Sequence, residues 1–176
     1  MWETFIDDLL IAHVMQDPQS CLENFEDRFR QSIGEKFGGA SRWVSLQFPL
    51  VLSQAQAEKL LDPKGWNLGA GSAQGLSDLA NRHLSAATAR RFSLEADDRD
   101  FVDYLVGLRN YLSHRSAGSR IKFLDSVGAL KVGGLNDRLT GQVMNLGTYL
   151  KQRIPSGGTR VNIIGERAVE ISRKLV

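Results

Sequence analysis

The stretch ADDRDFVDYLVGLRNYLSH, residues 96–114, decides the fold that this sequence predicts. Its apolar residues recur at intervals of three and four, which places them on one face of an α-helix. Asp97 and Asp100 lie where acidic side chains favour the start of a helix. We therefore predict that 96–114 is the longest helix of the chain.

The rest of the chain carries a similar helical pattern. Pro18 ends the first helix, because proline disfavours helical geometry in the residue before it, and Gly38 with Gly39 ends the second. We predict further helices at 2–16, 19–37, 53–61, 76–91, 119–131 and 136–153, with a last one in the tail.

Two stretches rich in β-branched or aromatic residues, 43–52 and 160–164, depart from this pattern. Both are interpreted as short extended pieces, although Pro49 argues against a central strand in the first. The predicted fold class is mostly α, a single-domain helical bundle over 1–176. Its core bundle is expected at about 75–153, with additional N-terminal helices and the two extended pieces as elaborations.

The composition limits the class of protein. A chain of 176 residues suits one domain, and its single cysteine, Cys21, rules out an internal disulfide and fits a reducing compartment. No apolar run approaches about 18 residues, so we expect no membrane-spanning helix. The N-terminus MWETFIDDLL is acidic where a secretory signal would be basic, so we expect a cytoplasmic protein.

Charge is unevenly distributed along the chain. Residues 1–104 carry 10 Lys and Arg against 16 Asp and Glu, a net charge of −6, whereas residues 105–176 carry 12 against 4, a net charge of +8. A basic C-terminal portion could attract a polyanion such as RNA. It could equally be a solvated surface balanced by the acidic portion, and the charge pattern alone leaves both open.

Three other groups invite a functional interpretation, but a structural one fits each better. The glycine-rich GAGSAQG (69–75) has neither GxGxxG spacing nor the lysine of a P-loop, which favours a plain loop. The acidic residues at 97–103 suit a helix start better than a cation site. We predict a core or interface position for His13, a surface position for His83 beside Arg82, and no metal or cofactor, since metal-ligand spacing is absent.

Arg109, Asn110 and His114 lie within six residues, RNYLSH, at the end of the predicted long helix. At about 100° per residue they face away from the core. The expected buried face consists of Phe101, Leu105, Leu108 and Leu112. Val102 and Val106 lie on or beside the side of the helix that carries these polar residues. An isolated bundle would not place valines there. An apolar patch beside a polar cluster suggests that a second chain covers it.

The three side chains suit the cleavage of RNA by its own 2′-hydroxyl. Histidine moves protons near neutral pH, and arginine supplies fixed positive charge where the phosphate becomes more negative. His114 and Arg109 are therefore the candidate catalytic residues, with Asn110 orienting either partner, and the reaction requires no metal. The candidate residues for holding the flanking phosphates are Arg115, Arg120 and Lys122. The structural alternative is a capped helix end.

RNYLSH resembles the Arg-x4–6-His signature of the HEPN superfamily, small helical domains in which a polar residue commonly follows the arginine. The resemblance is specific over these six residues and extends loosely over the helical pattern of about 75–153. It implies a dimer in which two copies of the motif form one cleft, with Arg109 and His114 catalytic and Asn110 supporting. It also implies a metal-independent endoribonuclease, often a toxin or antiviral effector in bacterial conflict systems.

The expected function is therefore a homodimeric endoribonuclease that leaves a 2′,3′-cyclic phosphate. RNA is the expected substrate, and an antitoxin or a neighbouring-gene product is an expected further partner. Some members of the superfamily lack nuclease activity and serve as nucleotide- or protein-binding modules, and this alternative stays open. So does an all-helical scaffold in which Arg109 and His114 only cap and hydrogen-bond. Residues 1–60 are either part of the bundle or a separate partner-binding layer.

Overall fold

The structure is a computed structural model that describes all residues except 1, 50, 64–69, 132–134, 136–144 and 155–156. The side chains of residues 40 and 41 are outside the description as well. Part of the predicted loop 65–75 and the first half of the predicted helix 136–153 therefore lie outside the described residues.

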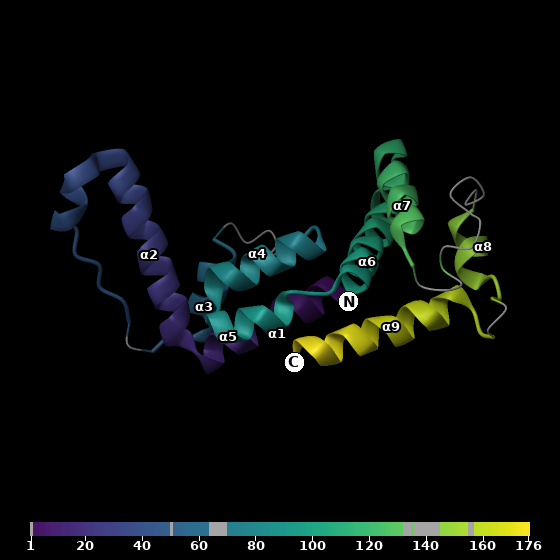
Figure 1. Ribbon diagram of the computed structural model, residues 1–176, viewed down its shortest axis with the longest axis horizontal. Coiled ribbons are helices and arrows are strands. Elements are labelled where there is room, and N and C mark those ends of the chain that lie inside the picture. The colour runs from purple at the N-terminus through teal and green to yellow at the C-terminus, as the bar shows by residue number, and fades with distance from the viewer. Residues whose placement is uncertain (1, 50, 64–69, 132–134, 136–144, 155–156) are drawn as a thin grey trace. The chain divides into compact units, whose positions relative to one another are not determined.

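Helices account for most of the described residues, and no strand occurs among them (Figure 1). The α-helices are α1 (Trp2–Gln16), α2 (Pro18–Phe37), α3 (Gln54–Leu61), α4 (Ala73–His83), α5 (Ala86–Ala89), α6 (Ala96–His114), α7 (Ala117–Ala129), α8 (Leu146–Lys151) and α9 (Arg160–Leu175). Two short 3₁₀ helices are η1 (Gly38–Trp43) and η2 (Arg90–Phe92). None of the helices in the described ranges combines the length and apolarity needed to cross a bilayer. The predicted mostly α-helical fold class is confirmed.

The two ends of α2 show how the sequence sets helix boundaries. The Asp17 carboxylate accepts a hydrogen bond from the backbone N–H of Ser20 at 3.2 Å, and Pro18 occupies the first turn, where no N–H is needed. At the other end Gly38 has a φ of +57°, which glycine adopts without strain. The predicted helix 19–37 therefore matches α2 to within one residue.

Neither predicted extended piece forms a strand. The described residues of 44–52 are irregular, and 160–164 belong to the beginning of α9. The β-branched residues in the second stretch suggested extended structure, but Ile171 and Leu175 further along the same helix are fully buried. Packing of this apolar face outweighs the local preference of the β-branched residues.

The contacts within the chain fall into two compact units. The N-terminal unit comprises residues 1–70 and 75–93, and the C-terminal unit comprises 71–74 and 94–176. The division falls inside the stretch 75–153 that was expected to form one core bundle. The candidate catalytic residues and the whole of α6 to α9 belong to the C-terminal unit.

In the N-terminal unit, α1 packs against α2 and α3. Ile6, Leu10 and Val14 form the buried side of α1. His13 is buried beside them, and its ring meets the ring of Phe92 edge-on, with the ring centroids 5.7 Å apart. His13 is therefore part of the core, as predicted.

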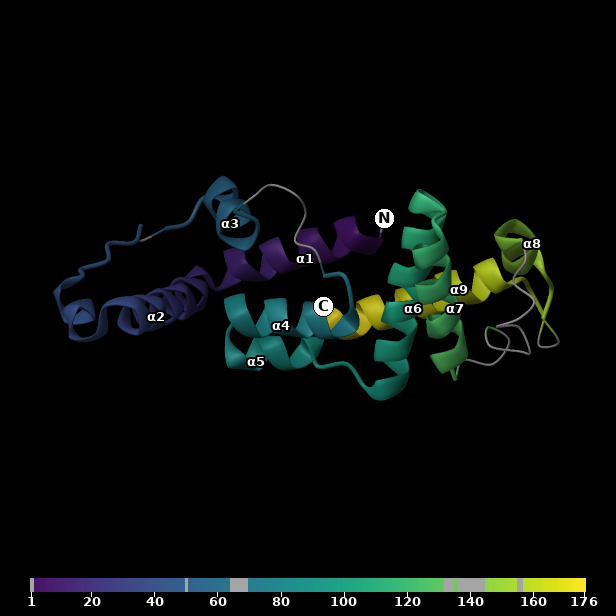
Figure 2. The ribbon, with the colours of Figure 1, turned by 90° about the horizontal axis from the view of Figure 1, so that it is seen from above.

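In the C-terminal unit, α6 and α7 lie side by side (Figures 1 and 2). Gly107 allows a close approach, because a Cβ at this position would lie 3.0 Å from Ser126 Oγ and 3.3 Å from the Phe123 Cα. An aromatic cluster, buried except for the half-buried Tyr111, extends this contact to α8, and its members are Phe101, Tyr104, Tyr111, Phe123 and Tyr149. The hydroxyl groups of Tyr104 and Tyr149 lie 3.3 Å apart. Close backbone contact and ring packing thus hold α7 and α8 against α6.

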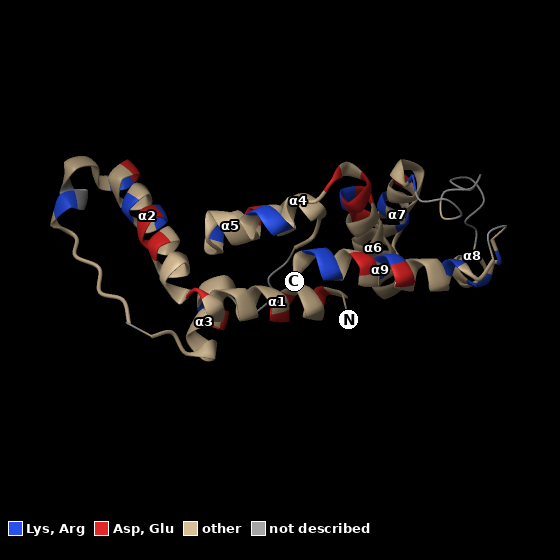
Figure 3. Cartoon of the chain, turned by 60° about the horizontal axis from the view of Figure 1, so that its bottom comes forward, with Lys and Arg blue, Asp and Glu red and all other residues tan. Residues whose placement is uncertain are grey.

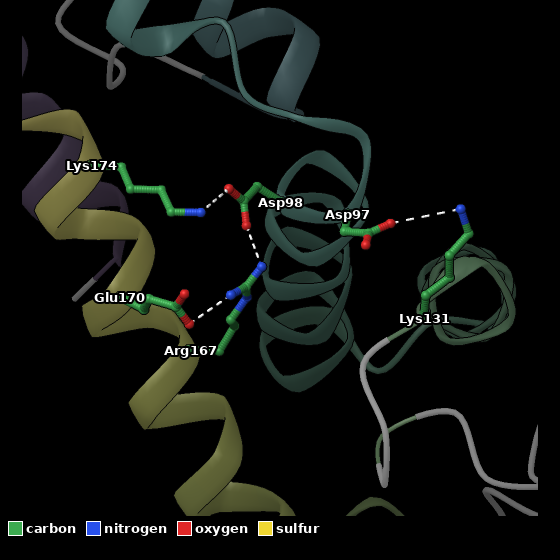
Figure 4. Close-up of polar contacts among 6 residues, drawn as sticks. All are labelled: Asp97, Asp98, Lys131, Arg167, Glu170 and Lys174. Carbon is green, nitrogen blue, oxygen red and sulfur yellow. Dashed lines mark hydrogen bonds and ion pairs between the residues drawn. The ribbon is translucent and has the colours of Figure 1, made fainter.

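A buried carboxylate joins the beginning of α6 to α9 (Figure 4). The side chain of Asp98 is 3% exposed and accepts hydrogen bonds from Arg167 and, at 2.7 Å, from Lys174 Nζ. Arg167 also donates to Glu170 at 2.6 Å, and this hydrogen bond raises the pKa of the guanidinium. The N-terminal end of α6 is therefore anchored by ion pairs to α9.

Several acidic residues lie along this end of α6 (Figure 3), and two of them besides Asp98, namely Asp97 and Asp103, have contacts of their own. Asp97 forms an ion pair with Lys131 at 3.6 Å, in which both side chains are more than half exposed. Asp103 accepts a hydrogen bond from the backbone N–H of Ala73, the first residue of α4, at 2.6 Å. Across the described residues, no three potential metal-binding side chains gather in one place. These contacts agree with the structural interpretation of the acidic residues.

Candidate functional site

The candidate catalytic residues lie at the C-terminal end of α6, close to the start of α7. Arg109 and His114 are exposed, and Asn110 is half-buried. Arg109 Nη1 donates a hydrogen bond to Asn110 Oδ1 at 2.9 Å. Asn110 and His114 are four residues apart, so they lie on the same side of the helix, one turn from each other. The structure thus joins Arg109 to Asn110 by a hydrogen bond and places His114, the last residue of the helix, one turn beyond Asn110.

A two-residue turn follows His114 and leads directly into α7. Arg115 has a φ of +47° and a ψ of +23°, a left-handed conformation that costs a non-glycine residue about 1–2 kcal/mol. Its backbone N–H donates to the carbonyl of Tyr111 at 3.0 Å. Ser116 then caps α7, because its Oγ accepts a hydrogen bond from the backbone N–H of Ser119 at 3.1 Å. His114 is therefore held beside the N-terminus of α7.

The N-terminus of α7 presents backbone donors at this turn. Ala117 and Gly118 are exposed, and a Cβ added to Gly118 would meet nothing within 4 Å. The first N–H groups of a helix have no acceptor within the helix, and they carry the positive end of its dipole. An anionic group such as a phosphate can therefore approach the backbone here.

The three candidate RNA-binding residues are all exposed around the same turn. Arg115 lies in the turn itself, and Arg120 and Lys122 lie in the first half of α7. Since Arg120 and Lys122 are two positions apart, their side chains leave the helix about 160° from each other. The three cations therefore surround the start of α7 and do not form one row.

A cleft of about 450 Å³ opens beside the turn. One wall comes from the end of α6 and the turn, and the other from α8; its lining includes Tyr111, Leu112, Arg115, Asn145, Leu146 and Leu150. The volume lies within the range of about 300–1,000 Å³ that is usual for small-molecule sites. The lining combines apolar side chains with polar groups, among them the Arg115 guanidinium and the Asn145 amide.

The predicted faces of α6 need correction. Val102 and Val106, expected beside the polar side of the helix, are 2% and 6% exposed in the single chain. The reason is that α6 contacts both α7 and α9, so its buried surface is wider than one stripe. Leu112, expected in the core, is 48% exposed and lines the cleft. The two valines therefore give no reason to expect a second chain.

Two features of the structure escaped the sequence-based prediction. The start of α8 contributes Asn145 and Leu146 to the cleft, and no motif marks either residue. His83, expected at the surface, is 4% exposed. Its spacing from the buried Leu76 and Ala80 is the helical spacing of an apolar face, and this signal could have identified His83 as buried.

Comparison of the chain with protein-family models, with curated proteins and with solved structures finds no match. The HEPN resemblance therefore rests on the residues of this chain alone. Those residues are Arg109, Asn110 and His114, together with the helical pattern around them. The resemblance stays a prediction.

Proposed function

We propose that the chain is a metal-independent endoribonuclease whose active site is the turn between α6 and α7. The exposed end of α6 carries this proposal, because Arg109 is connected there through Asn110 to the side of the helix that bears His114. The left-handed Arg115 already ends α6, and Ser116 already begins α7. The turn between the two helices thus has caps of its own.

The proposed reaction is a transesterification within the RNA. The 2′-oxygen attacks the adjacent phosphorus, the bond between phosphorus and the 5′-oxygen breaks, and the products are a 2′,3′-cyclic phosphate and a 5′-hydroxyl. His114 accepts the proton of the 2′-hydroxyl or returns a proton to the leaving 5′-oxygen. Arg109 places its guanidinium against the phosphate oxygens, whose negative charge grows in the transition state, and Asn110 orients that guanidinium.

The surroundings of the turn supply the groups that would hold the RNA. The backbone N–H groups at Ala117 and Gly118 are open to a phosphate oxygen, and Arg115 adds a positive charge beside them. Arg120 or Lys122 would contact a phosphate further along the strand. The cleft between α6 and α8 would receive a base next to the scissile phosphate. A single-stranded substrate fits this arrangement, because its bases are free to leave the stack.

We also propose that two copies of the chain combine their turns into one site. Leu112 on α6 and Ile121 on α7 are 48% and 59% exposed, and both lie close to His114 in the sequence. Covering them with a second copy would remove apolar surface from water. A second His114 would then be available, so that one histidine accepts a proton while the other donates one.

Replacing Ile121 with aspartate is expected to yield a monomer and to abolish cleavage, because each copy would bury one charge in the interface. Sedimentation velocity measures the mass, and a labelled RNA measures the cleavage. Val169→Asp is the matched control, since Val169 on α9 is 49% exposed and lies away from the turn in sequence. Cleavage of RNA by a monomeric wild-type chain would contradict the proposal of a shared site. It would remain consistent with an active site in a single chain.

The decisive test of the nuclease is a cleavage assay in the presence of EDTA. Arg109→Ala is expected to lower the cleavage rate about 10²–10³-fold, as removal of one transition-state donor does in other enzymes. The control is Arg99→Ala, which removes an exposed arginine near the other end of the same helix. Equal cleavage by wild type and Arg109→Ala would remove the proposed site. A wild type that binds RNA without cutting it would favour the non-catalytic binding module.

A further inference from the structure

A second group of basic side chains lies in the N-terminal unit, where α2 runs beside the end of α4. Asn24 Nδ2 on α2 donates to the carbonyl of Leu84 at 2.9 Å, which ties α2 to the residue after α4. One turn further along α2, Arg28 Nε donates to the Asn24 carbonyl at 3.2 Å. This hydrogen bond holds the Arg28 guanidinium near Arg82 and His83, the last two residues of α4.

Two buried nitrogen atoms of this group have no hydrogen-bond partner in the described part of the chain. They are Arg28 Nη2 and His83 Nδ1. The His83 side chain belongs to a residue that is only 4% exposed. Buried polar atoms are nearly always paired, because leaving one unpaired destabilises the folded chain. One such atom lies on each of two helices, on residues close enough for their charges to interact, so one acceptor could serve both.

The charges around His83 identify the kind of acceptor. Burial, with repulsion from Arg28 and then Arg82, lowers the pKa of His83 to about 4, so its ring is neutral at physiological pH. Burial and the charge of Arg82 also lower the pKa of Arg28. Cys21 lies close enough to Arg28 to interact with it, but burial raises the pKa of this thiol, which keeps it uncharged. The group therefore combines two positive charges with a neutral imidazole.

We propose that Arg28, Arg82 and His83 form a binding site for a phosphate group. Arg28 donates through Nη2, and neutral His83 donates when its one ring proton is on Nδ1. Arg82 supplies the second positive charge. Two guanidinium charges suit the charge of about −1.5 to −2 that a phosphate group carries at neutral pH, whereas a carboxylate carries only −1.

The three residues of this site differ in their exposure to solvent. Arg82 is exposed, Arg28 is half-buried, and His83 is buried. A phosphate would first meet Arg82 and would then reach the unpaired atoms of the other two residues. Because all three residues belong to the N-terminal unit, the site does not depend on the proposed nuclease.

Titration of the full chain with inorganic phosphate tests this site, with NMR of the His83 ring as the readout and sodium chloride at matched ionic strength as the control. Phosphate is expected to shift the His83 ring signals and to raise the unfolding temperature, since it binds only the folded chain. Arg28→Gln and Arg82→Gln are each expected to weaken phosphate binding about 10- to 100-fold. Arg30→Gln should leave it unchanged, because this arginine on α2 pairs with Glu26 instead.

His83 ring signals that do not move with phosphate would overturn the proposal. So would signals that move as much with chloride or acetate as with phosphate, or that move at the same phosphate concentrations in both arginine variants as in the wild type. Arg82 is exposed, so Arg82→Gln keeps the test decisive if Arg28→Gln does not fold. Phenyl phosphate as a second probe separates the two sources of the group: tighter binding than inorganic phosphate indicates a phosphate carried by a larger molecule, and weaker binding indicates free phosphate.

Discussion

Replacing His114 with alanine is expected to slow RNA cleavage about 10²–10⁴-fold, the loss that follows removal of an acid–base group. The fold should remain, because His114 is exposed and is the last residue of α6. RNA binding should also remain, since the neighbouring cations and backbone N–H groups are unchanged. The measurement is the single-turnover rate on a labelled RNA. The 2′,3′-cyclic phosphate end is identified by its resistance to a ligase that requires a free 3′-hydroxyl.

Free imidazole provides the chemical control for this variant. Imidazole added to His114→Ala should restore part of the cleavage rate, because it can move protons in the vacated position. The matched variant is Ser113→Ala, which changes an exposed neighbour on the same helix and should keep the wild-type rate. If His114→Ala cuts RNA as fast as the wild type, the histidine takes no part in the reaction.

Replacing Asp98 with alanine is expected to lower the free energy of unfolding by about 2–4 kcal/mol. The substitution removes a buried carboxylate and leaves Arg167 and Lys174 without their shared partner. The expected loss is smaller than for a fully buried pair, because the Lys174 side chain is 45% exposed and can be hydrated. Urea unfolding followed by circular dichroism measures the change.

Asp97→Ala is the matched control for this substitution. Both aspartates lie in the first turn of α6, so both lose the same favourable interaction with the helix dipole. Asp97 pairs with Lys131 at 3.6 Å, and both side chains are more than half exposed, so its loss should cost less than about 1 kcal/mol. Equal destabilisation by the two substitutions would mean that the ion pairs between Asp98 and α9 add no stability to that of the helix-dipole interaction, which both aspartates share.

Features with local causes could be predicted from the sequence. The predicted helix 96–114 coincides with α6, and 19–37 differs from α2 by one residue, because helix periodicity, caps and breakers act over a few neighbouring residues. The stretch 160–164 was assigned wrongly because its β-branched residues gave the local signal. The packing that makes it helical depends on residues further along α9.

In the candidate site, too, features with local causes could be predicted from the sequence, and features that depend on other helices could not. The hydrogen bond between Arg109 and Asn110 joins adjacent residues, and the exposed position of His114 follows from where α6 ends. The burial of Val102 could not be predicted from one helix, because it depends on which other helices contact α6. The cleft could not be predicted either, since one of its walls comes from α8, far along the chain.

The two ends of α6 have different surroundings, so substitutions at the two ends are expected to change the stability of the chain differently. The first turns are fixed by Asp98 and its partners on α9, whereas Arg109 and His114 stand in solvent at the other end. Substitutions at exposed positions usually change stability by less than about 0.5 kcal/mol. New side chains at the exposed end of α6 are therefore expected to leave the core that supports the helix unchanged.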